Sequence, residues 1–300
     1  MSDGRGNLPT ERTNPRSRGL DRMTTEEAVS CFPDEDATIV DAVRRARADI
    51  ARAVDLVAER LARGGRLFYV GAGTSGRLGV LDSVECPPTF QSDPDLVRAL
   101  IAGGPVALRG AVEGAEDDRE GAHAELTEAA LGEADCVFGI TAGGTTPYVH
   151  GALELAARRG AGTVFFACVD ADSVPDAADV SIRVVTGPEV LSGSSRLKAG
   201  TATKLVLNMV STLVMTKLGK VHDNLMVDVN TRANAKLVER GVRLIERITG
   251  LPGDAARELL ERAEGQVKHA CVMHAHDCDL ETARERLERA DGTLRRALET

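Results

Sequence analysis

Residues 66–76 read RLFYVGAGTSG, a short apolar run that leads directly into a glycine-rich turn. The run from Arg66 to Val70 is typical of a buried strand, and the turn is typical of a strand-to-helix connection. A similar unit follows at Asp135 to Ile140, which leads into Thr141 to Pro147 (TAGGTTP). Strands that alternate with helices, and that lack period-two polarity, predict a parallel sheet with helices on both faces. We therefore expect an α/β fold with a doubly wound parallel sheet.

The rest of the chain extends this pattern and then departs from it. Further strands are expected at 96–101, 163–169 and 180–185. Helices are expected at 36–63, 113–131, 147–159 and 195–218, with a short one after GAGTSG that Pro87-Pro88 interrupts. Residues 1–34 contain three prolines and little periodicity, which predicts an extended arm. Beyond Gly253, charged helical patterns at 254–263, 267–275 and 279–298 predict a small helical bundle.

The composition argues against nucleic acid and membranes as partners. The net charge is −9, and aromatic residues make up 3% of the chain with no Trp, so neither a basic footprint nor a stacking platform is present. The most apolar stretch, Leu205 to Met215, is interrupted by Asn208 and is too short to span a bilayer. The polar N-terminus does not read as a secretory signal. The six cysteines form no CxxC pair, which is typical of reduced thiols in a cytoplasmic protein.

The string GAGTSG matches the G-x-G-x-x-G pattern of dinucleotide-binding proteins, but its context does not. That fingerprint also requires an acidic residue at the end of the second strand, to hold the ribose. Here the second expected strand ends in Ala102-Gly103-Gly104, without an acid. A nicotinamide cofactor is therefore not expected.

Hydroxyl side chains in three loops favour a phosphate ligand instead. Each loop precedes an expected helix: Gly73-Thr74-Ser75, Gly143-Gly144-Thr145-Thr146 and Ser192-Gly193-Ser194-Ser195, the last with Lys198 one turn further on. Helix N-termini present N–H groups and a partial positive charge to anions, and hydroxyls add donors. One such loop alone would be a tight turn with an N-cap. Three in one βα array point to a single phosphorylated sugar.

Longer strings resemble the SIS (sugar isomerase) fold and, within it, the N-acetylmuramic acid 6-phosphate etherases, a family related to the glucokinase regulatory protein. The resemblance rests on VGAGTSGRLGVLDSVECPPTF (70–90), AVEGAEDDREG (111–121), GSSRLKAGTATKLVLNMVST (193–212) and NLMVDV (224–229). It extends over nearly the whole chain. It implies an N-terminal arm and helix (1–56), a SIS domain (57–220), and a connecting helix with a small UBA-like helical domain (221–300). One departure is visible: the etherases carry Ser and Arg where this chain has Gly143 and Thr145.

The resemblance implies a lyase that cleaves the D-lactyl ether of the phosphorylated amino sugar by elimination and water addition. It places the catalytic carboxyl groups at Glu85 and Glu116. We assign Glu85 as the acid on the leaving oxygen and Glu116 as the base at C2, with the exchanged roles as the alternative. The residues alone favour a surface carboxylate for Glu85 and a solvated helix start for Glu116. No metal or redox cofactor is expected, because two carboxyl groups suffice for both proton transfers. The family also implies a homodimer.

Three alternatives remain open at this point. A sugar-phosphate isomerase on the same fold would form a ketose and no lactate, and a non-catalytic sugar-phosphate sensor would bind without turnover. The cluster Cys271, His274, His276 and Cys278 could be a metal site, but its spacing fits no common zinc pattern.

Overall fold

The computed structural model describes residues 8–229, 231 and 235–299. The first seven residues of the expected arm lie outside the described residues. By their contacts the residues fall into two compact units, Met1–Val84 with Asp95–Ser211, and Glu85–Pro94 with Thr212–Thr300. The domain boundaries expected at 57 and 221 stay predictions.

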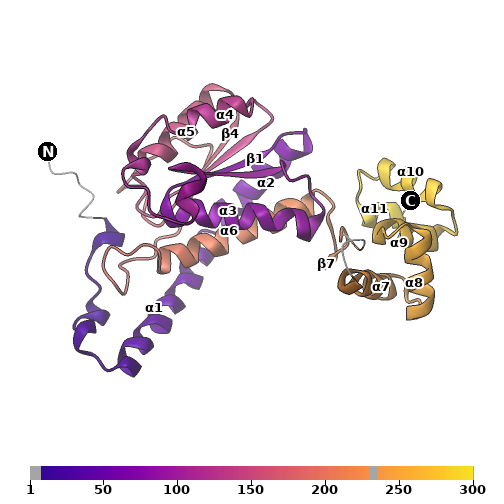
Figure 1. Ribbon diagram of the computed structural model, residues 1–300, viewed down its shortest axis with the longest axis horizontal. Helices are drawn as coiled ribbons and strands as arrows, with labels where there is room; N and C mark the ends of the chain where they lie inside the picture. The colour runs from indigo at the N-terminus through magenta and orange to yellow at the C-terminus, as the bar shows by residue number, and fades with distance from the viewer. Residues whose placement is uncertain (1–7, 230, 232–234, 300) are drawn as a thin grey trace. The chain divides into compact units, whose positions relative to one another are not determined.

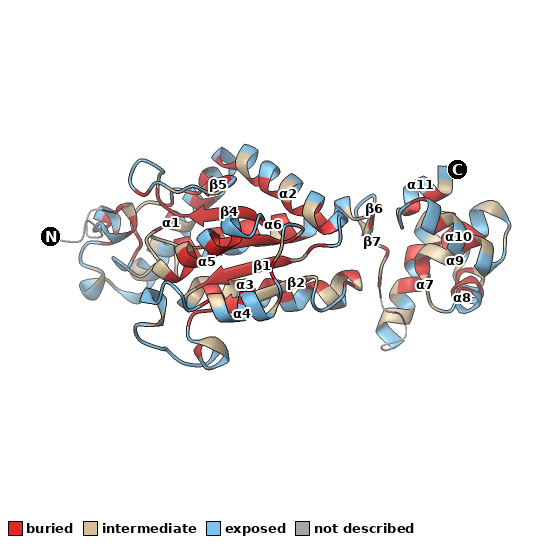
Figure 2. Ribbon diagram, turned by 90° about the horizontal axis from the view of Figure 1, so that it is seen from above, coloured by how far each residue is buried: buried red, intermediate tan, exposed pale blue. Residues whose placement is uncertain are grey.

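The first unit contains a five-stranded parallel sheet, as the sequence predicts. Its strands are β1 (Leu67–Gly71), β2 (Val97–Ile101), β3 (Cys136–Ile140), β4 (Gly162–Ala167) and β5 (Val180–Arg183). Their order is β2-β1-β3-β4-β5, and every neighbouring pair is parallel. β1, β3 and β4 are buried along their whole length, which explains their continuous apolar sequences (Figure 2).

Helices cover both faces of this sheet (Figure 1). On one face α5 (Pro147–Arg158) and α4 (His123–Glu128) bury a core that includes Phe68, Val137 and Phe165. The other face carries α2 (Arg47–Ala62), α3 (Gly73–Phe90) and α6 (Lys198–Lys217). There the buried carboxylate of Asp82 on α3 accepts hydrogen bonds from Tyr69 of β1 and Asn208 of α6, at 3.0 and 2.6 Å. The doubly wound α/β architecture is confirmed.

The N-terminal region differs from the prediction. Its first part consists of three single turns, η2 (Pro9–Glu11), η3 (Pro15–Ser17) and η4 (Leu20–Arg22). A helix, α1 (Thr25–Arg45), then begins eleven residues before the expected start at 36 and runs through Pro33. A capping box between Thr24 and Glu27 fixes this start. Burying Ile39 and Val43 contributes about 1.5–3 kcal/mol each, which offsets the loss of about 3 kcal/mol at an internal proline.

Other expected helix boundaries were wrong for local reasons. The expected helix at 36–63 is two helices, α1 and α2, which meet at Ala46. Pro87-Pro88 does not shorten α3, because both prolines lie in its last turns before Gln91 adopts a positive φ of 47°. The acidic segment 113–131 forms only the turn η6 (Ala115–Asp117) and α4, after η5 (Gly104–Leu108). The expected helix at 279–298 is broken at Gly292, whose φ is 69°.

The second unit is mainly helical, as expected. A short hairpin of β6 (Val221–His222) and β7 (Leu225–Met226) precedes its helices. These are α7 (Ala235–Thr249), α8 (Gly253–Arg262), α9 (Val267–His276), α10 (Leu280–Arg289) and α11 (Leu294–Glu299). They enclose a separate apolar core around α9, with Val272 fully buried.

No helix in the described part of the chain is long and apolar enough to cross a membrane.

One ion pair joins the starts of β1 and β3. The buried carboxylate of Asp135, just before β3, accepts hydrogen bonds from the backbone N–H groups of Arg66 and Gly132, at 2.8 and 3.0 Å. It also pairs with the Arg66 guanidinium, with Nη2 and Oδ2 2.9 Å apart. Burial by itself would raise the pKa of Asp135, but these donors lower it below its usual value.

We predict that this pair makes the stability of the protein depend on pH. A carboxyl group with a lowered folded-state pKa stabilises the fold above its unfolded-state pKa, and this stabilisation disappears as the pH falls through the folded-state pKa. Asp135→Asn is expected to lower the free energy of unfolding at pH 7 by about 1–3 kcal/mol, measured by urea titration. The difference from wild type should shrink steadily below pH 4. Asp21→Asn, at an exposed site, should show neither effect; a constant difference at all pH values would contradict the assignment.

Candidate active site

A polar cavity of about 410 Å³ lies in the first unit where the order of the strands reverses. The chain passes from β1 to β2 on one side and from β3 to β4 on the other, so the loops after β1 and β3 diverge. Ala72, which follows β1, and Ala142, which follows β3, both line the cavity. This crevice at the carboxyl ends of the strands is the usual ligand site of doubly wound sheets.

The loop between β1 and α3 forms the first wall. A Cβ atom at Gly76 would lie 2.7 Å from the carbonyl oxygen of Gly71 and 2.6 Å from Ile101, so only glycine lets α3 start this close to the sheet. Thr74 and Ser75 stand in the first turn of α3 and line the cavity. The first N–H groups of a helix have no partner within it, so this turn offers backbone and hydroxyl donors together.

The loop between β3 and α5 forms the second wall. Gly143, Thr145 and Thr146 line the cavity. Thr146 is the N-cap of α5, but its side chain makes no capping hydrogen bond. The alternative interpretation, in which this hydroxyl serves only as a helix cap, is therefore not what the structure contains. Its residue, Thr146, lines the cavity instead.

The loop before α6 contributes less than expected. Ser195 lines the cavity, whereas Ser194 does not. The first N–H groups of α6, on Lys198 and Ala199, donate to the carboxylate of Glu189 at 2.8 and 3.0 Å. Glu189 is fully buried, which raises its pKa although these N–H groups act in the opposite direction. An internal carboxylate thus occupies the helix terminus at which we expected a phosphate.

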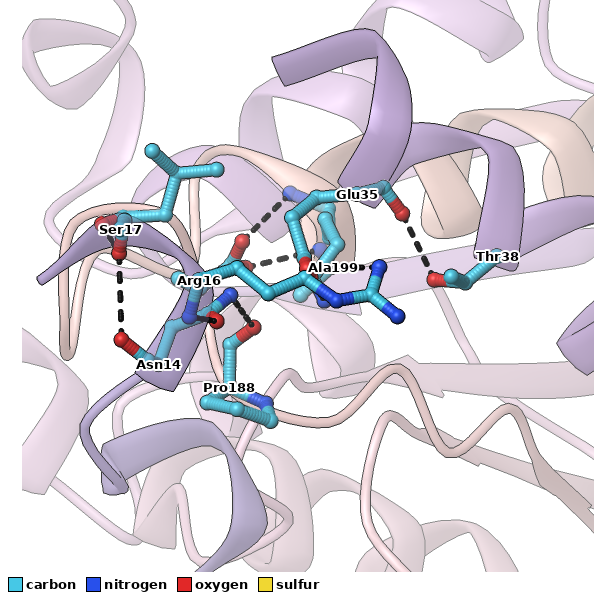
Figure 3. A network of polar contacts seen from close by, with 10 residues as sticks. Asn14, Arg16, Ser17, Glu35, Thr38, Pro188 and Ala199 are labelled. Atoms are coloured by element: carbon cyan, nitrogen blue, oxygen red, sulfur yellow. Dashed lines mark hydrogen bonds and ion pairs between the residues drawn. The ribbon is translucent and has the colours of Figure 1, made fainter. Parts of the chain in front are cut away.

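Lys198 is also engaged by the protein. Its side chain is 2% exposed, and its Nζ donates to Oε2 of Glu35 on α1 at 2.5 Å. Figure 3 shows the network around Glu35, which also includes Arg16 at 3.3 Å. Burial acts to raise the pKa of Glu35, but Lys198, Asn14 and Arg16 together lower it. Lys198 does not line the cavity; it joins α1 to the loop that carries Ser195.

The two predicted catalytic carboxylates are in different places. Glu116 lines the cavity from η6, a single turn that follows Gly114 with a φ of 74°. The Arg77 guanidinium of α3 supports the segment before this turn by donating to the carbonyl of Gly110 at 2.8 Å. Glu85 does not line the cavity: it is exposed, ten residues beyond Ser75 on α3, a rise of about 15 Å.

The cavity has no cationic side chain among the described residues that line it. Three carboxylates line it instead, those of Glu11, Glu116 and Asp117. An anion bound here would be held by hydroxyls, backbone N–H groups and the positive ends of α3 and α5. Among the described residues no group of three or more His, Cys, Asp and Glu side chains could hold a metal ion. The residues Cys271, His274, His276 and Cys278 therefore form no such group.

The structure therefore brings together most of the predicted site. The predicted residues that line the cavity are Gly73, Thr74, Ser75, Glu116, Gly143, Thr145, Thr146 and Ser195. Sequence reasoning missed Leu8 and Glu11 of the arm, Asp117 and Thr203. Asp117 is adjacent to the predicted Glu116, whereas nothing in the local pattern of the arm indicates a contact with loops more than 130 residues away.

Comparison with known proteins finds one matching family model and several similar proteins. The model for the glucokinase regulatory protein N-terminal SIS domain matches residues 49–157. Proteins named N-acetylmuramic acid 6-phosphate etherase are similar over nearly the full length. That of Crocosphaera subtropica is 51% identical, over 98% of this chain and 96% of the relative. That of Gloeobacter violaceus is 56% identical, over 90% of this chain and 88% of the relative.

A solved structure supports the fold alone. A Bacteroides fragilis protein assigned as a phosphosugar isomerase involved in capsule formation superposes with a TM-score of 0.50. The match covers 71% of this chain and 99% of that one, at 19% sequence identity.

We predict that replacing Lys198 affects stability more than substrate binding. Lys198→Met leaves Glu35 and Glu189 buried without a nearby ammonium group, a loss of about 3–5 kcal/mol in the free energy of unfolding. The double variant Glu35→Gln/Lys198→Met should recover part of that loss, because it removes one of the unpaired charges. Lys204→Met, at an exposed position on the same helix, is the control.

Urea unfolding and the KM of the folded fraction separate the two roles of Lys198. If Lys198→Met left stability at the wild-type value but raised KM, the side chain would be a substrate ligand after all.

Proposed function

Because the chain belongs to the family of N-acetylmuramic acid 6-phosphate etherases, we propose that it cleaves the ether between C3 of N-acetylmuramic acid 6-phosphate and D-lactate. The products are N-acetylglucosamine 6-phosphate and D-lactate. The observation that carries this proposal is the cavity at the strand reversal, which combines hydroxyl and N–H donors for a phosphate with the carboxylate of Glu116. An anionic sugar bound in this cavity would therefore lie beside a proton-transfer group.

The phosphate is placed against the two helix termini. Thr74 and Ser75 at α3, and Thr145 and Thr146 at α5, offer donors from both sides of the strand reversal. Ser195 adds a hydroxyl from the third loop. Since no cation lines the cavity among the described residues, these neutral donors supply the attraction. Thr145 supplies a hydroxyl where the family of the resemblance carries Arg, whereas Gly143 lacks the hydroxyl of the Ser found there.

The reaction requires two proton transfers on the open-chain form of the sugar. The C1 aldehyde acidifies the proton on C2, and Glu116 removes this proton as the general base. The electron pair of the C–H bond forms the C2–C3 double bond as the C3–O bond breaks. Glu85 gives a proton to the leaving lactyl oxygen, and water then adds to C3 while C2 regains a proton. No redox change occurs, so the residues named here account for every electron and proton.

In our proposal, Glu85 acts in the cavity of a second copy of the chain. Within one chain it is exposed and lies about 15 Å along α3 from Ser75. The preceding residues Leu81 and Val84 are 50% and 57% exposed, an apolar surface that a partner would cover. We propose a homodimer in which Glu85 of each chain completes the cavity of the other.

We propose a cytoplasmic location for the enzyme. All six cysteines are free thiols, and Cys86, Cys136, Cys168 and Cys271 are buried. Free thiols in these numbers are typical of a reducing compartment.

The two glutamates are expected to differ in an isotope-exchange assay. Glu85→Gln keeps the shape of the side chain but cannot deliver a proton, so D-lactate release should fall about 10²–10⁴-fold while some deuterium still enters C2. Glu116→Gln should suppress both lactate release and exchange, because the first proton is not removed. Lactate is followed with a coupled dehydrogenase and exchange by NMR in D₂O. Glu120→Gln, an exposed carboxylate in the same acidic segment, is the control.

The reverse pattern in the two variants would exchange the roles of Glu85 and Glu116. Release of lactate at the wild-type rate by both variants would refute the two-carboxylate mechanism. Formation of a ketose phosphate without lactate by the wild-type protein would instead identify a sugar-phosphate isomerase. Binding without turnover would identify a sensor.

Subunit mixing tests the shared site. If Glu85 acts in the cavity of the partner, a mixed dimer of Glu85→Gln and Glu116→Gln chains contains one intact site. After co-refolding of equal amounts, about one quarter of the wild-type activity should return. No recovery, with dimers present by light scattering, would show that Glu85 does not act across the interface, and a monomer would exclude the homodimer.

A further inference from the structure

The N-terminal arm forms one wall of the cavity. Leu8, which precedes the turn η2, and Glu11, its last residue, both line it. Leu8 is 7% exposed and packs in the same apolar core as Tyr148 and Val149 of α5. Its Cδ1 atom would lie 3.5 Å from a Cβ atom at Gly143, in ordinary contact with the second loop. The arm is therefore seated on the loops that form the site.

The far side of the turn is fixed as well. The Asn14 side chain donates to the carbonyl of Pro188 at 3.3 Å, and the Ser17 hydroxyl donates to the carbonyl of Val190 at 2.7 Å (Figure 3 shows Asn14, Ser17 and Pro188). Both side chains are buried. These bonds attach the arm to the segment that leads to Ser195. Glu11 lies between the two anchored points and takes no part in the anchoring.

The carboxylate of Glu11 has no hydrogen-bond or ion-pair partner among the described residues, and its residue is exposed to the cavity it lines. Its Oε2 atom reaches toward the third loop, 3.1 Å from where a Cβ atom would stand on Gly193. A carboxylate only accepts hydrogen bonds, so it attracts O–H and N–H groups and repels phosphate and lactate. Of the chemical groups on an amino-sugar phosphate, the sugar hydroxyls and the acetamido N–H match it.

We propose that Glu11 is a substrate-binding residue that accepts a hydrogen bond from the neutral sugar part of the ligand. The inference rests on the proposed function for the identity of the sugar. The cavity then has two sides, one of hydroxyl and N–H donors for the phosphate and one with the Glu11 acceptor for the sugar. Glu11 selects ligands that carry hydroxyl groups and discriminates against a bare anion.

Two binding probes separate this role from a structural one. Calorimetry is performed with N-acetylglucosamine 6-phosphate and with inorganic phosphate, on the full chain. Glu11→Ala should lower the affinity for the sugar phosphate about 10–100-fold, because a charge-assisted hydrogen bond is lost. It should leave the affinity for inorganic phosphate unchanged or raise it, because a repelling charge is gone. Glu11→Gln keeps an acceptor atom and should fall between the wild type and Glu11→Ala.

Two further variants define the comparison. Ser75→Ala, on the phosphate side, should weaken both probes. Asp21→Ala removes the same charge from an exposed site on the same arm and should change neither. In steady-state assays Glu11→Ala should raise KM with kcat within about threefold, since the lost contact is present in both ground and transition states.

An equal loss of affinity for both probes in Glu11→Ala would show that Glu11 only holds the arm in place and would overturn the proposal. Unchanged affinity for the sugar phosphate would also overturn it. The result is independent of turnover. If the wild-type protein released no lactate but bound the sugar phosphate through Glu11, the proposed function would fail and this inference would stand.

Discussion

The order of the strands reverses between β1 and β3, and the site depends on this reversal. All five strands are parallel, so their carboxyl ends meet at a single edge of the sheet. Only between β1 and β3 do the following loops turn away from each other and leave a crevice. The close approach of Gly76 to Gly71 then sets the first turn of α3 at that crevice. Every other wall of the cavity is built against this pair of loops.

Different residues bind the ligand and support the loops of the site. Lys198 is a cation near the expected phosphate position, yet its charge is taken up by Glu35 and the helix terminus beside it by Glu189. Two buried carboxylates and a buried ammonium are costly to desolvate, and they stabilise the fold only as a set. The set fixes the loop before α6 with respect to α1. The ligand-facing surface is left with hydroxyls, N–H groups and carboxylates.

The sheet was predictable because parallel strands are buried on both sides and read as continuous apolar runs. RLFYV and DCVFGI both led to strands within one residue of the structure. The glycine-rich loops could be assigned to the cavity for the same reason, since a strand end fixes where the following turn stands. Helix boundaries were less predictable. Pro33 and Pro87 favour breaks by local pattern, but burial in one case and a position in the last turns in the other let the helix continue.

The remaining errors come from contacts between distant parts of the chain. Lys198 is in a loop whose composition indicates a ligand, and only the tertiary placement of Glu35 shows that its charge is used internally. The contribution of Glu11 has the same origin, because its place in the cavity is fixed by bonds from Asn14 and Ser17 to residues more than 170 positions away. Local periodicity carries no information about such pairs. The position of Glu85 depends, in our proposal, on a second chain.

The seating of the arm has a consequence for how the protein is made. Residues 8–17 are synthesised more than 120 residues before their partners near Gly143, Pro188 and Val190. The nascent chain therefore cannot close the wall of the cavity until the segment that precedes α6 has left the ribosome. Closing so long a loop is slow because its entropy must be lost before the contacts form. Order in the site accordingly arrives at a late step of folding, after the sheet itself can already assemble.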